Sequence, residues 1–364
     1  MTQGERFDRL DRFDVVGVGA LNLDYLAAWS GPRDRVEAVV NSAVGSPVGW
    51  GSEAAVEENV VRRLLDLVNP ADVTVSAGGS TFNMVYALAH ARPDLALGYV
   101  GVAGSSPEGG FSAMDALGRV GVDVTVVGRS PRLPGVCLAL GHDGDRTLFT
   151  HIGANSETAQ YLEQRFDELV EYLARARIVH VTSFLDPETP KVLLRLLTAA
   201  RSVRPDLVVT LDPGHVWCAD PSPEILSLVA LADYLLLNRA ELGLLAGRVG
   251  AVGGEDEAGA LLRTMVTPRP IVLVKLPDGV VLYQTAGTQL VGHKMLAPDE
   301  VVDSTGAGDV FAAGLLAMLV AGSPGPHEVE LGAQLGLTLA RHKLRHLGSR
   351  GHAAFGALTQ ELGS

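Results

Sequence analysis

The chain has 364 residues, 47% hydrophobic and 20% charged, enough for one large α/β domain or two smaller ones. A net charge of −13 excludes nucleic acid as the main partner, because phosphate backbones need a basic surface. Cys137 and Cys218 form neither a metal-binding pattern nor a disulfide framework. No apolar run is long enough to span a membrane, and Met1–Phe13 is too charged for a signal peptide, so we expect a soluble, cytoplasmic protein.

The N-terminal part starts with residues 1–12, which have mixed charge without periodicity and are expected to form a flexible tail. Asp14–Gly19 is predicted to be a buried strand. It is not a dinucleotide-binding fingerprint, because Asn22 stands at the third glycine position and no helix-forming run follows directly. A carboxylate at Asp24 can accept two hydrogen bonds from a vicinal diol, or it can close an Asx turn at the strand end.

The next segment contains loop material at Gly31-Pro32 and at residues 45–51. Ser52–Val68 is predicted to be a helix, with early acidic and later basic residues and an apolar stripe. A strand at Val73–Val75 then leads through a glycine-containing turn into a helix at Phe82–His90. The turn is also consistent with simple capping of that helix by a serine or threonine side chain.

In the middle of the chain, the pattern of apolar residues predicts a strand at Leu97–Ala103 and a helix at Gly110–Val120. Gly135–Leu140 and Arg146–Ile152 are joined by Asp143-Gly144 and are predicted to form a hairpin.

From residue 159 onward, predicted strands and helices alternate, which is typical of a parallel sheet covered on both faces. The strands are predicted at Ile178–Thr182, Leu207–Leu211, Tyr234–Leu237 and Ile271–Lys275. The helices are predicted at Ala159–Ala174, Pro190–Ala200, Pro223–Ala230 and Gly332–Leu344. Asn238 and Glu241 follow one strand directly, where their oxygens suit either a hard cation or a capped helix start.

Val301–Val320 reads as a strand end, a turn of small residues and an apolar helix. Gly306 and Gly308 let an anion approach the backbone, and the N–H groups that follow lie at a helix N-terminus, which favours negative charge. Asp309 adds a carboxylate at the same place, which suits a base that deprotonates a hydroxyl attacking a phosphoryl group. The alternative is a structural turn with Asp309 as an ordinary first-turn acidic residue.

Asp303-Ser304-Thr305-Gly306-Ala307-Gly308-Asp309 resembles the C-terminal motif of the ribokinase/PfkB family of sugar and nucleoside kinases. Gly78-Gly79-x-x-x-Asn83 resembles its N-terminal motif, in wording close to that of adenosine kinases. Asn22-x-Asp24 and Asn238-x-x-Glu241 resemble two weaker motifs, in the right order along the chain. The resemblance implies a ribokinase-like three-layer α/β sandwich, with a mostly parallel central sheet, helices on both faces and a small lid.

The resemblance also implies a division of the chain. The core is expected at residues 13–24, 77–130 and 154–355, with lid excursions at 25–76 and 131–153. The first excursion is longer and more helical than in relatives.

The implied activity is ATP-dependent phosphorylation of a hydroxymethyl group on a nucleoside or sugar, with Mg²⁺. The alternatives are a free-sugar kinase of the ribose or fructose type, a catalytically silent nucleotide- or nucleoside-binding relative, and a Rossmann dehydrogenase. The acceptor, a K⁺ requirement and a homodimer paired through the lid are left open. Trp29, Trp50 and Phe82 are available to stack on a base.

The resemblance assigns roles to individual residues. Asp309 is the implied base, with an anion hole formed by Gly306, Ala307 and Gly308. The implied acceptor-binding residues are Asn22, Asp24, Gly78, Gly79 and Asn83. The implied nucleotide-binding residues are Asn238, Lys275, Gly279 and Gly308.

Three further positions complete this assignment. Arg146 is expected either to reach the phosphates or to be a solvated hairpin arginine. Glu241 is expected to hold Mg²⁺ through water. Asp303, together with the segment Gly348–Arg350, is expected to hold a monovalent cation.

Overall fold

A mixed sheet forms the centre of the molecule in the computed structural model, which describes residues 13–44, 50, 53–105, 112–142, 145–248, 271–284, 287–320 and 326–363. Within those residues its strand order is β15-β14-β13-β12-β11-β10-β1-β5. The neighbours from β13 to β5 are parallel, whereas β14 and β15 run antiparallel at one edge. The strands are β1 (Phe13–Val18), β5 (Leu97–Val100), β10 (Ala176–Thr182), β11 (Val208–Asp212), β12 (Tyr234–Asn238), β13 (Ile271–Leu276), β14 (Gly279–Gln284) and β15 (Gly287–Gly292).

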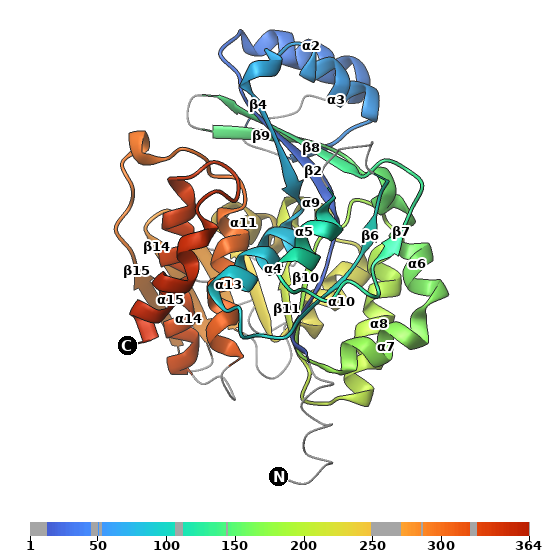
Figure 1. The fold of residues 1–364 in the computed structure, drawn as a ribbon, viewed down its shortest axis with the longest axis vertical. Coiled ribbons are helices and arrows are strands. Elements are labelled where there is room, and N and C mark those ends of the chain that lie inside the picture. Colours follow the sequence, from blue (N-terminus) through green and yellow to red (C-terminus); the bar gives the residue numbers. More distant parts are fainter. Residues whose placement is uncertain are drawn as a thin grey trace.

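Helices cover both faces of this sheet (Figure 1), because its central strands carry apolar side chains on both sides. On β12, Leu236 faces one apolar cluster, while Leu235 and Leu237 face the other. The first face is covered by α4 (Ser80–Ala91), α5 (Ala113–Arg119), α13 (Ala307–Leu319), α14 (Pro326–Leu344) and α15 (Phe355–Gly363). The second is covered by α6 (Thr158–Gln164), α7 (Phe166–Ala174), α8 (Thr189–Val203), α9 (Gly214–Ala219), α10 (Pro223–Leu231) and α11 (Arg239–Arg248). The predicted three-layer α/β sandwich is confirmed.

A second sheet forms the lid above the carboxyl ends of the central strands (Figure 1). Its order is β3-β9-β8-β2-β4, with the strands β3 (Glu53–Ala55), β9 (Asp145–His151), β8 (Gly135–His142), β2 (Asn22–Ala28) and β4 (Val73–Gly78). The β8–β9 pair is the predicted hairpin, although its turn residues lie outside the described part. The strands extend beyond the expected lid bounds, since residues 22–24 and 77–78 also belong to this sheet.

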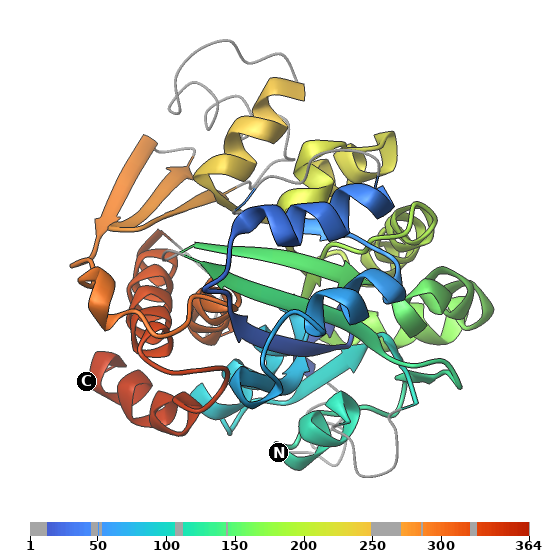
Figure 2. The same cartoon turned by 90° about the horizontal axis from the view of Figure 1, so that it is seen from above.

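Two helices, α2 (Arg33–Val44) and α3 (Glu58–Leu65), lie across the lid sheet (Figure 2). They bury one apolar face of it, where Val36, Val40, Val61 and Leu64 pack with residues such as Phe149. The lid therefore has its own small hydrophobic core.

Short elements connect these layers. Val102–Ala103 (β6) pairs with Gly128–Arg129 (β7). The 3-10 turns lie at Pro70–Asp72, Gly153–Glu157, Pro298–Glu300 and His352–Ala354. No helix in the described ranges is long and apolar enough to cross a membrane.

Several element predictions were wrong in detail. Ser52–Val68 is not one helix, because Glu53–Ala55 pairs with β9 as an edge strand before α3 begins. Ala159–Ala174 is two helices that break at Arg165, which has a non-helical backbone. Asn22 and Asp24 lie on the lid strand β2 rather than at the end of the first strand. Tail residues 1–12 lie outside the described part.

Candidate active site

The turn before α13 has a glycine at the start of the helix, where the backbone conformation favours glycine. Gly306 is the N-cap, with φ at 75°, a conformation that residues with a Cβ adopt at a cost. A Cβ there would also lie 3.2 Å from Nδ2 of Asn83. The N–H groups at the start of this 13-residue helix are thus left near the open N-terminus, which favours an anion.

Asp309 lies in the first turn of α13 and is held by the neighbouring helix. Asn83 on α4 donates its Nδ2–H to Oδ2 of Asp309 at 2.9 Å. Burial raises the pKa of Asp309 to about 6, and the negative charge of Asp212 adds to this effect, while the Asn83 hydrogen bond opposes it. A carboxylate with that pKa is ionised at neutral pH and is still a usable proton acceptor.

A lysine lies beside the same helix start. Nζ of Lys275, at the end of β13, donates to Oδ2 of Asp212 at 2.6 Å, and both side chains are largely buried. A Cβ on Gly308 would lie 3.3 Å from this Nζ. Burial alone would lower the pKa of Lys275, but the carboxylates of Asp212 and Glu241 raise it. The ammonium therefore remains charged beside the amides of the turn.

Asn238 and Glu241 form a reciprocal cap at the start of α11. The Asn238 N–H donates to Oε2 of Glu241 at 2.8 Å, and the Glu241 N–H donates to Oδ1 of Asn238 at 2.9 Å. Burial, together with the charge of Asp212, raises the pKa of Glu241 to about 7. The capping interpretation of this motif is confirmed, whereas its role toward Mg²⁺ stays a prediction; Asn238 also pairs in register with Lys275.

Several residues that the sequence predicts to bind the acceptor lie on the lid strand β2 and on the strand β4 beside it. Asp24 is 8% exposed, and its Oδ1 has no hydrogen-bond partner among the described residues. Burial, with the charges of Asp309 and Asp303, raises the pKa of Asp24 to about 7. A Cβ on Gly78 would collide with this carboxylate, at 2.0 Å from Oδ2, so glycine is required there. A buried, unsatisfied oxygen of this kind is a natural place for a ligand hydroxyl.

Asn22 is positioned by Asn155, which the sequence did not single out as a site residue. Nδ2 of Asn155 donates to Oδ1 of Asn22 at 2.9 Å, and Oδ1 of Asn155 accepts the Leu21 N–H at 3.0 Å. Gly79 takes a φ of 105°, and a Cβ there would meet the Ala20 carbonyl oxygen at 2.3 Å. The glycine is therefore fixed by the close packing of two backbones.

Two cavities lie beneath the lid. One, of about 370 Å³, lies beside the α13 turn. Its lining includes Asp24, Asn83, Asp303, Gly306, Lys343 and His352. The other, of about 510 Å³, lies between the lid and the ends of β1 and β10, and its lining includes Asn22, Glu53, Gly79, Thr150, Asn155 and Phe184. The predicted acceptor residues are thus distributed over both cavities.

Arg146 reaches from the lid hairpin to the α13 turn. Its guanidinium donates to the Ser304 hydroxyl, which joins the lid directly to the motif that contains Asp309. Arg146 is therefore not simply solvated, and its contact with phosphates stays a prediction.

Asp303 does not fit a monovalent cation. Nζ of Lys343 lies 2.5 Å from Oδ2 and 3.0 Å from the carbonyl oxygen of Asp303, and it also donates to the His346 carbonyl oxygen at 3.4 Å. The oxygens that a cation would need are thus already used by an ammonium. A cation at the predicted position would have to compete with Lys343 for these oxygens.

Other predicted site residues lie away from the residues around Asp309. Gly279 is buried against β15, where a Cβ would meet the Val291 carbonyl oxygen at 2.4 Å. Trp29 and Trp50 pack in the lid core, and Phe82 is buried and stacks on Tyr86. None of these three aromatic residues lines either of the two cavities, so nothing in the described part supports their stacking on a base.

Sequence reasoning missed several residues of the site. Asp212 could have been found, because it ends a predicted parallel strand, and ligands bind at the carboxyl ends of such strands. Lys343 and Asn155 act through contacts between segments far apart in the chain, and Glu53 lies on a lid strand that was predicted as helix. Asn155 ends a Gly-Ala-Asn run that resembles the family, whereas no local pattern marks Lys343 or Glu53.

Fold and site together define a small-molecule phosphotransferase that acts on an alcohol group. The sequence model of the pfkB family carbohydrate kinases matches residues 53–345, and the chain belongs to this family. It is a sugar or nucleoside kinase.

Two named relatives illustrate the range of the family. The chain is 24% identical over 277 residues to an adenosine kinase from Schizosaccharomyces pombe, covering 72% of this chain and 79% of that one. It is 27% identical over 256 residues to a fructokinase from Klebsiella pneumoniae, covering 67% and 77% of the two chains.

Solved structures show the same fold. An adenosine kinase from Sinorhizobium meliloti superposes with a TM-score of 0.78 at 21% identity, covering 96% of this chain and 99% of that one. A ribokinase from Giardia lamblia superposes with a TM-score of 0.72 at 15% identity, again covering 96% and 99%.

Proposed function

We propose that this kinase transfers the γ-phosphate of ATP to a hydroxymethyl group of a sugar-containing acceptor, with Asp309 as the base. The observation that carries the proposal is the position of Asp309. Its carboxylate is held by Asn83 in the first turn of α13, beside the charged Lys275, and its pKa is about 6. A base and an anion-binding helix start in one place suit phosphoryl transfer.

Each of the residues around the α13 turn has a separate role in this reaction. Asp309 takes the proton from the attacking hydroxyl, and the first amides of α13 stabilise the charge on the transferring group. Lys275 supplies a fixed positive charge beside Gly308, and Arg146 brings a second one from the lid to Ser304. These positive groups support ATP binding by an otherwise acidic protein.

Two carboxylates near Lys275 supply oxygen ligands that suit Mg²⁺. Glu241 and Asp212 are neighbouring carboxylates, and one oxygen of each is already used by the Asn238 N–H or by Lys275. The described residues contain no cluster of three or more His, Cys, Asp or Glu that could hold a metal directly. Glu241 would therefore hold Mg²⁺ through water, and the ion would neutralise charge on the ATP phosphates.

The acceptor would bind through hydroxyl groups. Asp24 presents an unpartnered carboxylate oxygen, and Asn22 presents an amide oriented by Asn155. Glu53 and Thr150 add polar groups on the same side, joined by a 3.1 Å hydrogen bond. This lining favours a polyhydroxylated ring, because each buried oxygen needs a hydrogen-bond partner.

One observation favours a nucleoside rather than a free sugar. Leu185 lines the 510 Å³ cavity next to the polar groups and offers an apolar contact to a base, backed by Phe184, which is only 2% exposed. Adenosine kinase and fructokinase both occur among the relatives, so the comparison is compatible with either acceptor.

The test is ADP release from Mg-ATP with adenosine, guanosine, inosine, cytidine, ribose and fructose as acceptors. Turnover with nucleosides supports a nucleoside acceptor in the 510 Å³ cavity. Turnover with free sugars alone keeps the kinase and removes the nucleoside. ATP binding without acceptor-dependent ADP release would overturn the proposal and favour a catalytically silent relative.

A further inference from the structure

We infer that Lys343 is a built-in monovalent cation, and that this kinase needs no K⁺ at the position beside Asp303. Lys343 lies in the last turn of α14, and the residue is only 2% exposed. Its ammonium contacts three oxygens from two separate segments: Oδ2 and the carbonyl oxygen of Asp303, and the carbonyl oxygen of His346. Carboxylate and carbonyl oxygens are the ligands that a hard cation uses.

The Lys343 ammonium balances the buried charge of Asp303, as a bound cation would. A buried carboxylate such as Asp303 is costly without a positive partner. Burial raises the pKa of Asp303, but Lys343 and the N–H groups of Thr305 and Gly348 together hold it below its ordinary value. Asp303 therefore stays ionised, with its charge balanced inside the chain.

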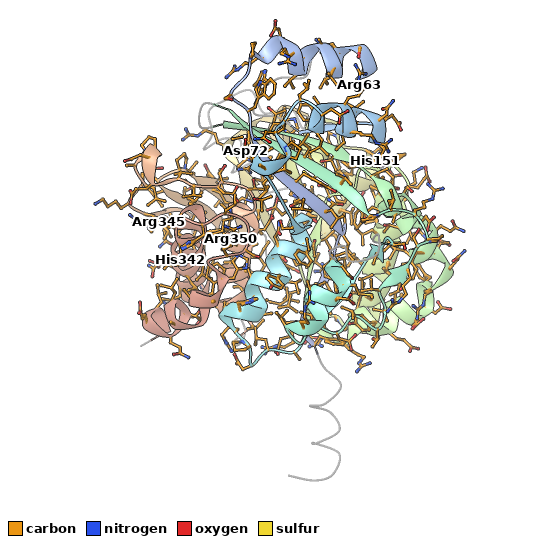
Figure 3. All side chains as sticks on the ribbon, turned by 45° about the horizontal axis from the view of Figure 1, so that its top comes forward. Arg63, Asp72, His151, His342, Arg345 and Arg350 are labelled. Atoms are coloured by element: carbon orange, nitrogen blue, oxygen red, sulfur yellow. The ribbon has the colours of Figure 1, made fainter. Side chains whose placement is uncertain are left out.

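Asp303 links the catalytic turn to the segment that follows α14. Its Oδ1 accepts the Thr305 N–H at 2.8 Å, one residue before the N-cap of α13. Its Oδ2 accepts the Gly348 N–H at 2.9 Å, in the segment on which Figure 3 labels Arg345 and Arg350. Lys343 thus fixes the geometry of the anion-binding turn without touching the substrate, which makes it a positioning residue.

The Lys343 side chain also occupies the position beside Asp303 where a monovalent cation would bind. It lines the 370 Å³ cavity together with Asp303 and Gly306, so the ammonium lies at the cavity wall directly beside the carboxylate. A tethered lysine cannot dissociate, whereas a free ion must be bound from solution. Burial lowers the pKa of Lys343, and the charge and hydrogen bond of Asp303 oppose this. The chain is therefore expected to be insensitive to the identity of the monovalent salt.

The first experiment measures thermal unfolding of the whole protein in KCl and in tetramethylammonium chloride at equal ionic strength. The wild-type Tm is expected to be the same in both salts. A saturable rise of the wild-type Tm with K⁺ would overturn the inference. This measurement does not depend on the proposed kinase function.

Two substitutions of Lys343 and one control variant extend the test. Lys343→Ala leaves a space beside Asp303, so its lowered Tm should recover in part with K⁺ or ammonium but not with tetramethylammonium. Lys343→Met fills the space with an apolar group and should not recover. Lys294→Met, at an exposed lysine, should behave like the wild type. If Lys343→Ala does not fold, the wild-type salt comparison decides alone.

The activity readout rests on the proposed function. Displacement of a catalytic turn lowers turnover by about 10–100-fold, and this loss is expected for Lys343→Ala in tetramethylammonium chloride. K⁺ should restore part of it for Lys343→Ala and none for Lys343→Met. A wild-type turnover that requires K⁺ would contradict the inference, whereas no turnover in any salt would count against the kinase proposal alone.

Discussion

A single carboxylate, Asp309, has the properties of a base because of its surroundings. It lies at a helix start that favours negative charge, yet burial and the charge of Asp212 raise its pKa to about 6. The Asn83 hydrogen bond fixes the direction of one carboxylate oxygen. These opposing influences leave Asp309 ionised at neutral pH and able to accept a proton.

The pH dependence of turnover follows from this pKa. Because the base must be ionised, kcat/KM is expected to fall as pH decreases through about 6. It should level off only above about 7, where Asp24 and Glu241 are ionised as well. A pH profile of ADP release at low acceptor concentration measures this. A profile that stays flat from neutral pH down to about 4.5, well below the pKa, would rule out Asp309 as the base.

Asp24 illustrates how a binding group lowers stability. Its pKa is about 7 in the folded protein and 3.8 for the free side chain, so the folded state binds the proton more tightly. The free energy of unfolding therefore falls as pH rises from about 4 to 7. Asp24→Asn should raise stability by on the order of 3 kcal/mol above pH 7 and by much less near pH 4.

Denaturant unfolding of wild type and Asp24→Asn at both pH values tests this expectation. Asp206→Asn, at a side chain that is 79% exposed, serves as the control and should change little. The same Asp24→Asn variant should lose acceptor affinity while it keeps ATP affinity. Equal loss of both ligands would remove Asp24 from the acceptor site.

At the scale of elements, the α13 turn depends on backbone conformation as much as on side chains. Gly306 has a φ of 75° and lies close to Asn83. Gly306→Ala is expected to cost about 1–2 kcal/mol of stability and to disturb the Asn83–Asp309 pair, which lowers turnover.

The matched control for this substitution is Gly118→Ala in α5. A Cβ on Gly118 would have open space around it, with no neighbouring atom within 4 Å, and the residue lies in a helix, so alanine there should be neutral or slightly stabilising. Denaturant unfolding and ADP release of both variants measure the difference. Equal stability and turnover of the two variants would show that the turn does not require glycine at 306.

The central layer and the α13 turn could be predicted because their signals are local. Apolar runs such as Leu235–Leu237 mark buried parallel strands, and the spacing of Gly306, Gly308 and Asp309 marks the turn. The lid was predicted less well because β3 is a three-residue edge strand held by pairing with β9. The Lys343–Asp303 pair joins residues 40 apart in the chain, so no short window of sequence contains it.

At the scale of the whole molecule, the lid has consequences for assembly. The sequence left open a homodimer paired through the lid. In the structure, α2 and α3 bury an apolar face of the lid sheet within the same chain, and Arg33, Asp34 and Arg35 lie exposed on the first turn of α2. An apolar face that is already covered does not need a second subunit.

We therefore expect the lid not to mediate dimerisation. Light scattering coupled to size-exclusion chromatography should give the mass of one chain, 38.2 kDa. The measurement should be repeated after the exposed Arg35 is replaced by glutamate, which should leave the mass unchanged. A dimer that dissociates with Arg35→Glu would contradict this expectation.

The central claim, that Asp309 drives phosphoryl transfer to an alcohol, is tested most directly by ADP release from Mg-ATP. Wild type and Asp309→Asn are compared with the best acceptor of the panel, and thermal unfolding confirms that both are folded. The account predicts that Asp309→Asn keeps ATP binding and loses about 10²–10⁴-fold in turnover. Wild-type-like turnover by a folded Asp309→Asn protein would contradict it.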